Sequence, residues 1–241
     1  PSIFYSNILG YDRNHIESLD IDIKFLDYKI ILSDRDKAIQ RKILIDPHVV
    51  KAVIKYKNQK YNAEVRLKGD LSDHWAAIHR MSMRINLKGD KTIHGLNEFN
   101  IQKPRTRSYP YDAVFQDTIR STGNLATEHN YVKVKVNGSD WGVMNLESHI
   151  DQEFLERNQK KESLVVRFSN EDGWYYKRVN NIHANKYYRL SDPILFSKVY
   201  SSGKNFDMAR RHMYTYVVEE RIKKNSELYD VDSYTRLLLL A

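Results

Sequence analysis

The most regular alternation of apolar and polar positions lies between residues 132 and 136, where valines alternate with lysines. A period of two is typical of a strand with one buried face. Asn137-Gly138 follows, a pair that supplies the positive φ angles of a two-residue hairpin turn. Trp141 and Val143 continue the apolar pattern beyond the turn. The pattern therefore predicts a β-hairpin at this point of the chain.

A short helix is predicted directly after the hairpin. Ser148 is placed as its N-cap, with Asp151 three residues later, and Phe154 and Leu155 give it an apolar face. Glu147 falls at the junction of strand and helix, where a carboxylate can be held against a sheet. On pattern alone, an ordinary hairpin followed by a helix explains all of these residues.

The region from Val49 to Leu87 has the same period of two and predicts a β-meander, with a turn at Asn58-Gln59 and a polar loop over residues 68–75. A further strand pair or edge strand is expected between Ile93 and Ile101. The meander strands are expected at residues 49–56, 61–67 and 81–87.

Helical periodicity appears in two places in the first half of the chain. One helix is predicted over residues 34–44, capped by Ser33 or Asp34, whereas residues 21–32 fit either a strand or a helix. Another is predicted over residues 111–122, ending at Gly123.

The last third of the chain changes character. A strand is predicted at residues 164–168 with a partner at 174–178, and the chain is predicted to be helical after Pro193. Long helices are expected over 206–224 and from 232 to the end. The fold class is therefore α+β, with an antiparallel sheet-rich part followed by a helical part. The predicted divisions are an N-terminal extension with a helix at 1–48, a sheet-rich lobe at 49–170 and an incomplete helical lobe at 171–241.

Composition narrows the chemistry. The 241 residues include no cysteine, which excludes disulfides, a thiol nucleophile and a cysteine zinc site. No apolar run is long enough to span a membrane, and no signal peptide is visible. The net charge of +8 indicates an anionic partner or simply favours solubility. Because the chain starts at Pro1 without methionine and stops inside a predicted helix, we expect a piece of a longer protein.

The basic side chains of the meander are the main candidates for binding. Arg66 and Lys68 alternate out of one strand, and Arg80 and Arg84 are predicted to share a face of the next. Together they form either an anion-binding face or the solvent side of an antiparallel sheet. The histidines are scattered without a metal-ligand spacing, and no phosphate loop, dinucleotide fingerprint or nucleophile elbow occurs, so no metal site and no nucleic-acid partner are predicted.

Several motifs in this order resemble the CotH kinase family, the spore-coat-protein-H-like atypical protein kinases. The resemblance covers about residues 50–241, and its most specific part runs from Val132 to Asp151. The motifs are RLKGDLSDHW, RMSMRINLKG, KPRTR, STGNLA, YVKVKVNGSDWGVMNLESHID and YDVDSYTRLLLL.

The resemblance implies an atypical kinase-like fold that binds ATP with Mg²⁺ or Mn²⁺ and phosphorylates a protein. By position, Lys68-Gly69-Asp70 falls on the loop that covers the nucleotide, and Arg80 or Arg84 falls where the family has a strand lysine. Glu147 falls on the acid that orients a phosphate-binding basic residue. Export or a surface or coat location is implied as well.

Two departures from the family pattern matter. The strand position carries arginine, which is not equivalent to lysine, and the catalytic and metal-binding acids are expected beyond Ala241. No catalytic residue or metal ligand is therefore assigned. The alternative is a non-catalytic surface or coat assembly module that binds a protein or an acidic polysaccharide on the same scaffold.

Overall fold

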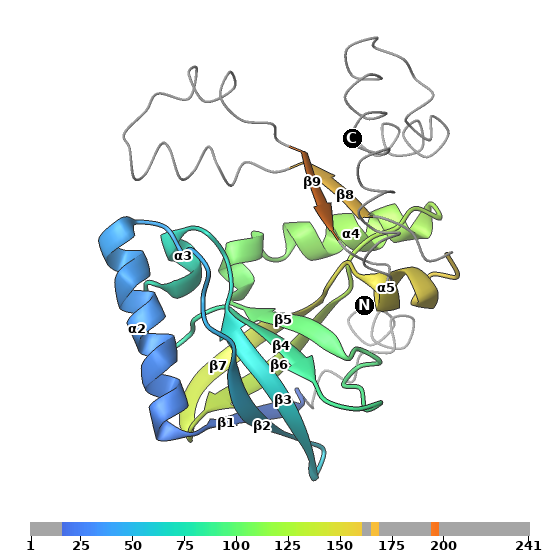
Figure 1. Cartoon of the computed structure of the whole chain (residues 1–241). Coiled ribbons are helices and arrows are strands. Elements are labelled where there is room, and N and C mark those ends of the chain that lie inside the picture. The colour runs from blue at the N-terminus through green and yellow to red at the C-terminus, as the bar shows by residue number, and fades with distance from the viewer. Residues whose placement is uncertain (1–15, 161–164, 169–193, 198–241) are drawn as a thin grey trace, which may run out of the picture. The chain divides into compact units, whose positions relative to one another are not determined.

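The computed structural model describes residues 16–160, 165–168 and 194–197 (Figure 1). Contacts divide the chain into two units. The barrel unit comprises the described residues up to Gln40, together with Leu44–Thr106 and His129–Glu147. The second unit comprises Arg41–Ile43, Arg107–Glu128 and the described residues from Ser148 onward.

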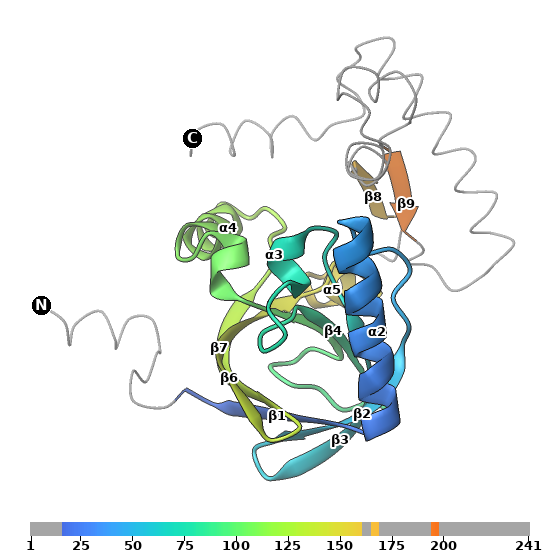
Figure 2. The ribbon, with the colours of Figure 1, turned by 90° about the vertical axis from the view of Figure 1, so that its left-hand side faces the viewer.

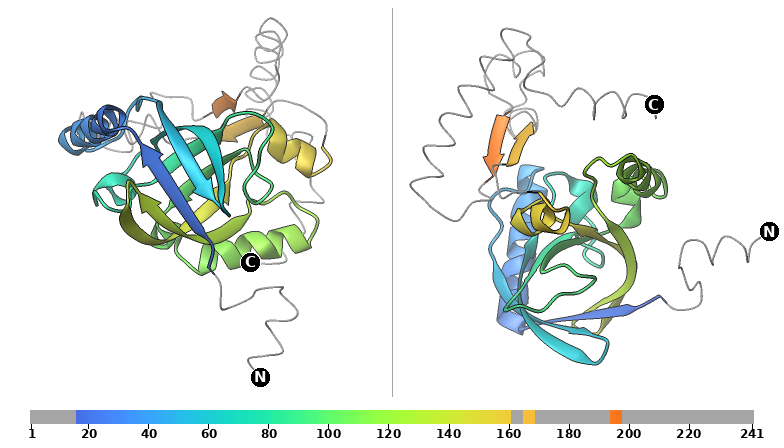
Figure 3. Two further views of the ribbon diagram at one scale, coloured as in Figure 1. Left: turned by 90° about the horizontal axis from the view of Figure 1, so that it is seen from below. Right: turned by 90° about the vertical axis from the view of Figure 1, so that its right-hand side faces the viewer.

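Seven strands form a closed barrel in the order β1-β2-β3-β4-β5-β7-β6, and Figure 3 shows them curving around its interior. Strand β6 closes it by pairing parallel with β1, whereas the pairs β1–β2, β2–β3, β3–β4, β4–β5 and β6–β7 are antiparallel. The strands are β1 (Ser18–Ile23), β2 (Val50–Tyr56), β3 (Gln59–Leu67), β4 (Met83–Leu87), β5 (Glu98–Gln102), β6 (His129–Val136) and β7 (Ser139–Ser148).

The barrel interior is apolar because alternate residues of each strand point inward. Met83, Ile85 and Phe99 are fully buried there, which confirms the period of two read from the sequence. In the β6–β7 hairpin the register shifts after Val134, which leaves Trp141 as an extra residue with 2% exposure. This irregularity lets the indole enter the core.

Helix α2 (Phe25–Arg41) lies along the outside of the barrel (Figures 1 and 2), with Ile31 and Ala38 buried. The prediction of a helix beginning at Asp34 was therefore wrong, because residues 21–32 hold the end of β1 and the first turns of α2. Asp34 is 5% exposed and accepts a hydrogen bond from His48 N at 2.7 Å. His48, which is distant along the chain, donates to the carboxylate of Asp34. Asp34 is therefore satisfied in the middle of a helix and does not mark the N-terminus of one.

The meander was predicted correctly in outline, with small shifts. The turn between β2 and β3 is at Lys57-Asn58, where φ is 45° and 60°. Strand β4 begins at Met83 rather than Met81, and the segment before β5 makes only an isolated bridge between Ile93 and Leu96.

Glu17 ties the start of β1 to two other parts of the barrel. It accepts hydrogen bonds from the Tyr56 hydroxyl and from Lys57 Nζ at 2.5 Å, and His94 Nε2 lies 3.1 Å away. Burial and the hydrogen bond to Glu17 raise the pKa of Tyr56 to about 12. The tyrosine therefore stays a neutral donor that holds the first strand in place.

In the second unit, α4 (Tyr111–Ser121) confirms the predicted helix, and α5 (Gln152–Arg157) buries Phe154 and Leu155 as predicted. The N-cap of α5 is Asp151, which accepts from the backbone N of Phe154 at 2.9 Å. Ser148 was predicted as the cap but is the last residue of β7.

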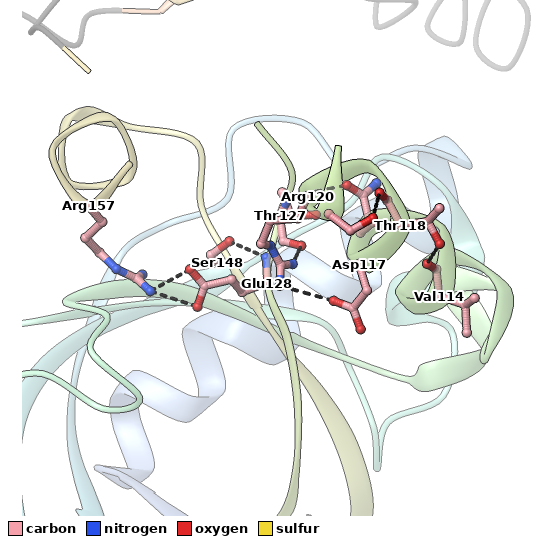
Figure 4. Close-up of polar contacts among 10 residues, drawn as sticks. Val114, Asp117, Thr118, Arg120, Thr127, Glu128, Ser148 and Arg157 are labelled. Carbon is pink, nitrogen blue, oxygen red and sulfur yellow. Dashed lines mark hydrogen bonds and ion pairs between the residues drawn. The ribbon is translucent and has the colours of Figure 1, made fainter. Parts of the chain in front are cut away.

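Within the second unit, Glu128 is hydrogen-bonded to Ser148 and to Arg157 of helix α5 (Figure 4). The backbone N of Glu128 donates to Ser148 Oγ at 2.9 Å. Arg157 Nη2 donates to both carboxylate oxygens of Glu128, at 2.6 and 2.7 Å (Figure 4). The Ser148 hydroxyl, which was predicted to cap a helix, instead accepts a hydrogen bond from the backbone just before β6.

Strand β8 (Val165–Phe168) was predicted and pairs with β9 (Ile194–Ser197), so the helix expected directly after Pro193 was wrong. The partner expected at 174–178 lies outside the described residues. The helices expected at 206–224 and 232–240 lie outside the described residues. The predicted domain boundaries at 48 and 170 stay predictions, although β1 and α2 are integral to the barrel unit. Among the described helices, none has the length and apolar character to cross a membrane.

Candidate functional site

The loop after β3 has a fixed shape. Trp75 ends the short helix α3 (Ser72–Trp75), is 1% exposed, and its Nε1 donates to Gly69 O at 3.1 Å. Asp70 O accepts from Leu44 N at 3.1 Å, and Lys68 N donates to Ser82 O at 3.0 Å. The loop is therefore anchored at several points, and its role in covering a nucleotide stays a prediction.

Gly69 is required by this shape. Its φ is +92°, and a Cβ atom placed on it would lie 2.1 Å from Cγ of His74. The imidazole itself is held by Ser82, whose Oγ lies 3.0 Å from His74 Nδ1. The tight turn and the position of the histidine both exclude a side chain here.

Two arginines lie opposite each other on the outer face of the barrel. Arg66 of β3 is the direct partner of Arg84 of β4, and Arg84 is in turn the partner of Asn100 of β5. Arg84 Nε donates to Asn100 Oδ1 at 3.2 Å and lies 3.5 Å from Glu98 Oε1. We name Arg66 and Arg84 the arginine row. Like charges directly opposite each other repel, and Glu98 lies beside Arg84 only, so an anion bound at the row would reduce the repulsion. The register confirms that Arg66 and Arg84 share a face, and anion binding by that face stays a prediction.

Arg80 is not on that face, and the prediction that it shares a strand with Arg84 was wrong. It lies in the loop before β4 with φ 135°. Its Nη2 donates to Val143 O of β7 at 2.7 Å, while its Nε is buried without a hydrogen-bond partner. The loop therefore carries this guanidinium to the middle of β7.

Glu147 lies near the end of β7 with 4% exposure, directly opposite His129 of β6. It accepts a hydrogen bond from the amide of Gln102, at the end of β5. Since Arg84 lies beside Glu98 and Arg80 binds the β7 backbone, the expected role of Glu147 as a partner of either arginine stays a prediction. Its carboxylate is nevertheless buried in the sheet, as the sequence predicted.

Lys103 is the residue that the sequence analysis missed. It directly follows β5 and is partly buried. Burial lowers its pKa, the charges of Arg80 and Arg105 lower it further, and Asp73 partly opposes them. The signal in the sequence was the segment FNIQK, an apolar strand that ends in a lysine, but the KPRTR segment was used only as one of the family motifs.

These residues lie on, directly after or against the neighbouring strands β5 and β7, and we name the set the β5–β7 cluster. Asp73 lies near its cations. Three cations and one buried carboxylate give it a net positive charge, which suits a polyanion such as a nucleotide triphosphate. The cluster consists of Arg80, Gln102, Lys103, Arg105, Asn145 and Glu147.

The predicted site residues thus fall in three neighbouring places. Arg80 and Glu147 belong to the β5–β7 cluster, Arg84 belongs to the arginine row, and Lys68-Gly69-Asp70 belong to the anchored loop. Within the described ranges, no group of three acidic, histidine or cysteine side chains could hold a metal ion.

Comparison with known proteins gives the family of the chain. A search of the curated proteins gave no match. The family described as CotH kinase protein matches residues 65–238, which is more than half of the chain and begins inside β3. The match includes the anchored loop, the arginine row and the whole β5–β7 cluster. The chain therefore belongs to the CotH kinase protein family.

Proposed function

We propose that this chain carries the ATP-binding part of a kinase with an atypical kinase-like fold, which transfers the γ-phosphoryl group of ATP to a protein hydroxyl. The single observation that carries the proposal is Lys103, a partly desolvated lysine beside two arginines at the end of a barrel strand. Partly burying a lysine near two other cations costs stability, and such costs are typical of functional sites. The family match supports the same reaction class.

Lys103 and Arg80 are the proposed phosphate ligands. Kinases neutralise the β- and γ-phosphates with a strand lysine and leave little covalent chemistry to the protein. Arg80 fits the role because its Nε is buried and unpaired, and a phosphate oxygen accepts from such a group. Arg84 and Arg66 offer a second anion site one strand away.

The remaining predicted residues have supporting roles in this proposal. The anchored loop at Lys68-Gly69-Asp70 covers the nucleotide at the end of β3, and Glu147 fixes the amide of Gln102 beside the phosphates. Mg²⁺ or Mn²⁺ would neutralise phosphate charge when bound. The described residues include no group of three acidic, histidine or cysteine side chains that could hold the ion, so no catalytic step is derived through it.

The proposal is tested by calorimetric titration of the 241-residue chain with ATP, with and without Mn²⁺. We expect micromolar binding that weakens as salt is raised, because charged side chains hold the phosphates. ADP should bind more weakly than ATP. No heat of binding with either nucleotide would contradict the proposal and favour a non-catalytic surface module.

A further inference from the structure

Unpaired buried polar atoms concentrate in the β5–β7 cluster. Among the described residues, four buried side-chain atoms have no hydrogen-bond partner: Arg80 Nε, Gln102 Oε1 and Asn145 Oδ1 in the cluster, and Trp141 Nε1 outside it. Gln102 and Asn145 are fully buried, at 0% exposure each. Leaving buried polar atoms unsatisfied costs stability, so several in one cluster indicate a group that binds there.

The orientation of Gln102 is fixed by its neighbour. Its Nε2 donates to the carboxylate of Glu147, and a flipped amide would set oxygen against oxygen. Its Oε1 must therefore point away from the carboxylate. The Asn145 amide lies against His129, with Nδ2 2.9 Å from His129 Nδ1, and the tautomer of the histidine decides which amide atom faces it.

The two oxygens need donors, whereas the cations beside them need an anion. Arg80 reaches β7 at Val143, two residues before Asn145, and Lys103 directly follows Gln102. A ligand that satisfies both requirements carries phosphates together with N–H or O–H donor groups. A nucleotide has this chemistry, with the 6-amino group of adenine and the ribose hydroxyls as its donors.

We propose that Gln102 and Asn145 determine nucleotide specificity, by accepting hydrogen bonds from donor groups of the nucleoside. The inference rests on the proposed ATP binding and adds to it the residues that select the nucleoside. A site built to accept a hydrogen bond discriminates against an analogue that lacks the donor, because its buried acceptor is then left unpaired. An ordered water on either oxygen would satisfy it without any such selectivity.

The test compares three nucleotides on the same chain by calorimetry. ATP is compared with inosine triphosphate, which has an oxygen in place of the 6-amino group, and with 2′,3′-dideoxy-ATP, which lacks the ribose hydroxyls. We expect at least one analogue to bind about tenfold more weakly than ATP, the loss of one hydrogen bond to a buried acceptor. The analogue that loses affinity identifies the donor.

Gln102→Met and Asn145→Leu then show which oxygen is responsible. At least one of them should weaken ATP by about tenfold and leave the discriminated analogue unchanged, so that the preference disappears. Asn86→Leu is the matched control, because the Asn86 amide also donates to a carboxylate, that of Glu98 at 3.2 Å, but lies elsewhere on the barrel. It should keep the full preference for ATP. Thermal unfolding verifies that each variant folds.

Equal affinity of the wild-type chain for all three nucleotides would overturn the inference while leaving ATP binding intact. Variants that weaken ATP and the analogue equally would overturn it as well. The wild-type comparison needs no variant, so a variant that fails to fold does not remove the test. A chain that binds none of the nucleotides overturns the proposed function itself, and this inference falls with it.

Discussion

Lys103→Met should reduce ATP affinity by about 10- to 100-fold, since a charge-assisted hydrogen bond to phosphate contributes about 1.5 to 3 kcal/mol. The same variant should be at least as stable as the wild-type chain. Because the pKa of Lys103 is lower in the folded state, the unfolded chain binds its proton more tightly. At neutral pH the charged lysine therefore destabilises the fold, and methionine removes that cost.

Calorimetry with ATP and a thermal melt measure the two effects on one sample. Lys51→Met is the control, because Lys51 is an exposed lysine on β2, and it should change neither quantity. Lys103→Arg keeps the charge but not the compact ammonium group, so it should restore only part of the affinity. Unchanged ATP affinity in Lys103→Met would remove this lysine from the site.

Gly69→Ala should lower the free energy of unfolding of the barrel unit by about 2 to 4 kcal/mol. A left-handed backbone costs a residue with a Cβ about 1 to 2 kcal/mol, and overpacking against the His74 ring adds about 1 to 3 kcal/mol. The loop, held by Trp75 and by Leu44 N, has few ways to relax. Chemical denaturation monitored by tryptophan fluorescence measures the change, because Trp75 is part of the loop.

Gly89→Ala separates the two contributions. Gly89 also has a positive φ, +79°, but nothing lies within 4 Å of the point that a Cβ atom would occupy there. It should therefore cost only about 1 to 2 kcal/mol, the backbone contribution alone. Equal losses in the two variants would show that His74 yields to the methyl group, and the anchored loop would be less rigid than its contacts imply.

The strands and hairpin were predictable because their period of two is a direct consequence of a barrel with an apolar interior. The closure of the barrel was not predictable. Strand β1 pairs parallel with β6 across more than a hundred residues, and no local pattern encodes such a partner. The same limit explains why the pairing of β8 with β9 was not predicted.

Helix ends were misjudged where a polar residue serves a tertiary contact. Asp34 and Ser148 both have side chains typical of N-caps, but one binds His48 and the other binds the backbone of Glu128. Asp151, three residues after Ser148, is the real cap. Sequence patterns identify the residues that are able to cap, and only the fold decides which of them does.

Part of the site could be predicted and part could not. Resemblance to the family pointed to the loop at Gly69 and to Glu147 as site residues. Both lie at the end of a strand that the sequence pattern predicted. The importance of Lys103 depends on Asp73 and Arg80, which come from a different loop, and on burial. Gln102 lies one residue beyond the strand pair or edge strand predicted between Ile93 and Ile101. Its unpaired oxygen is evident only from the structure, in which its amide donates to Glu147.

The most direct measurement of the central claim is amine acylation of the chain, mapped residue by residue with mass spectrometry between pH 7 and 9. Acylating reagents attack the neutral amine, and the lowered pKa of Lys103 gives it a larger neutral fraction than exposed lysines in this range. ATP with Mn²⁺ should slow the labelling of Lys103 at least tenfold and leave Lys51 unchanged. Labelling of Lys103 that is insensitive to saturating ATP would contradict the β5–β7 cluster as the nucleotide site.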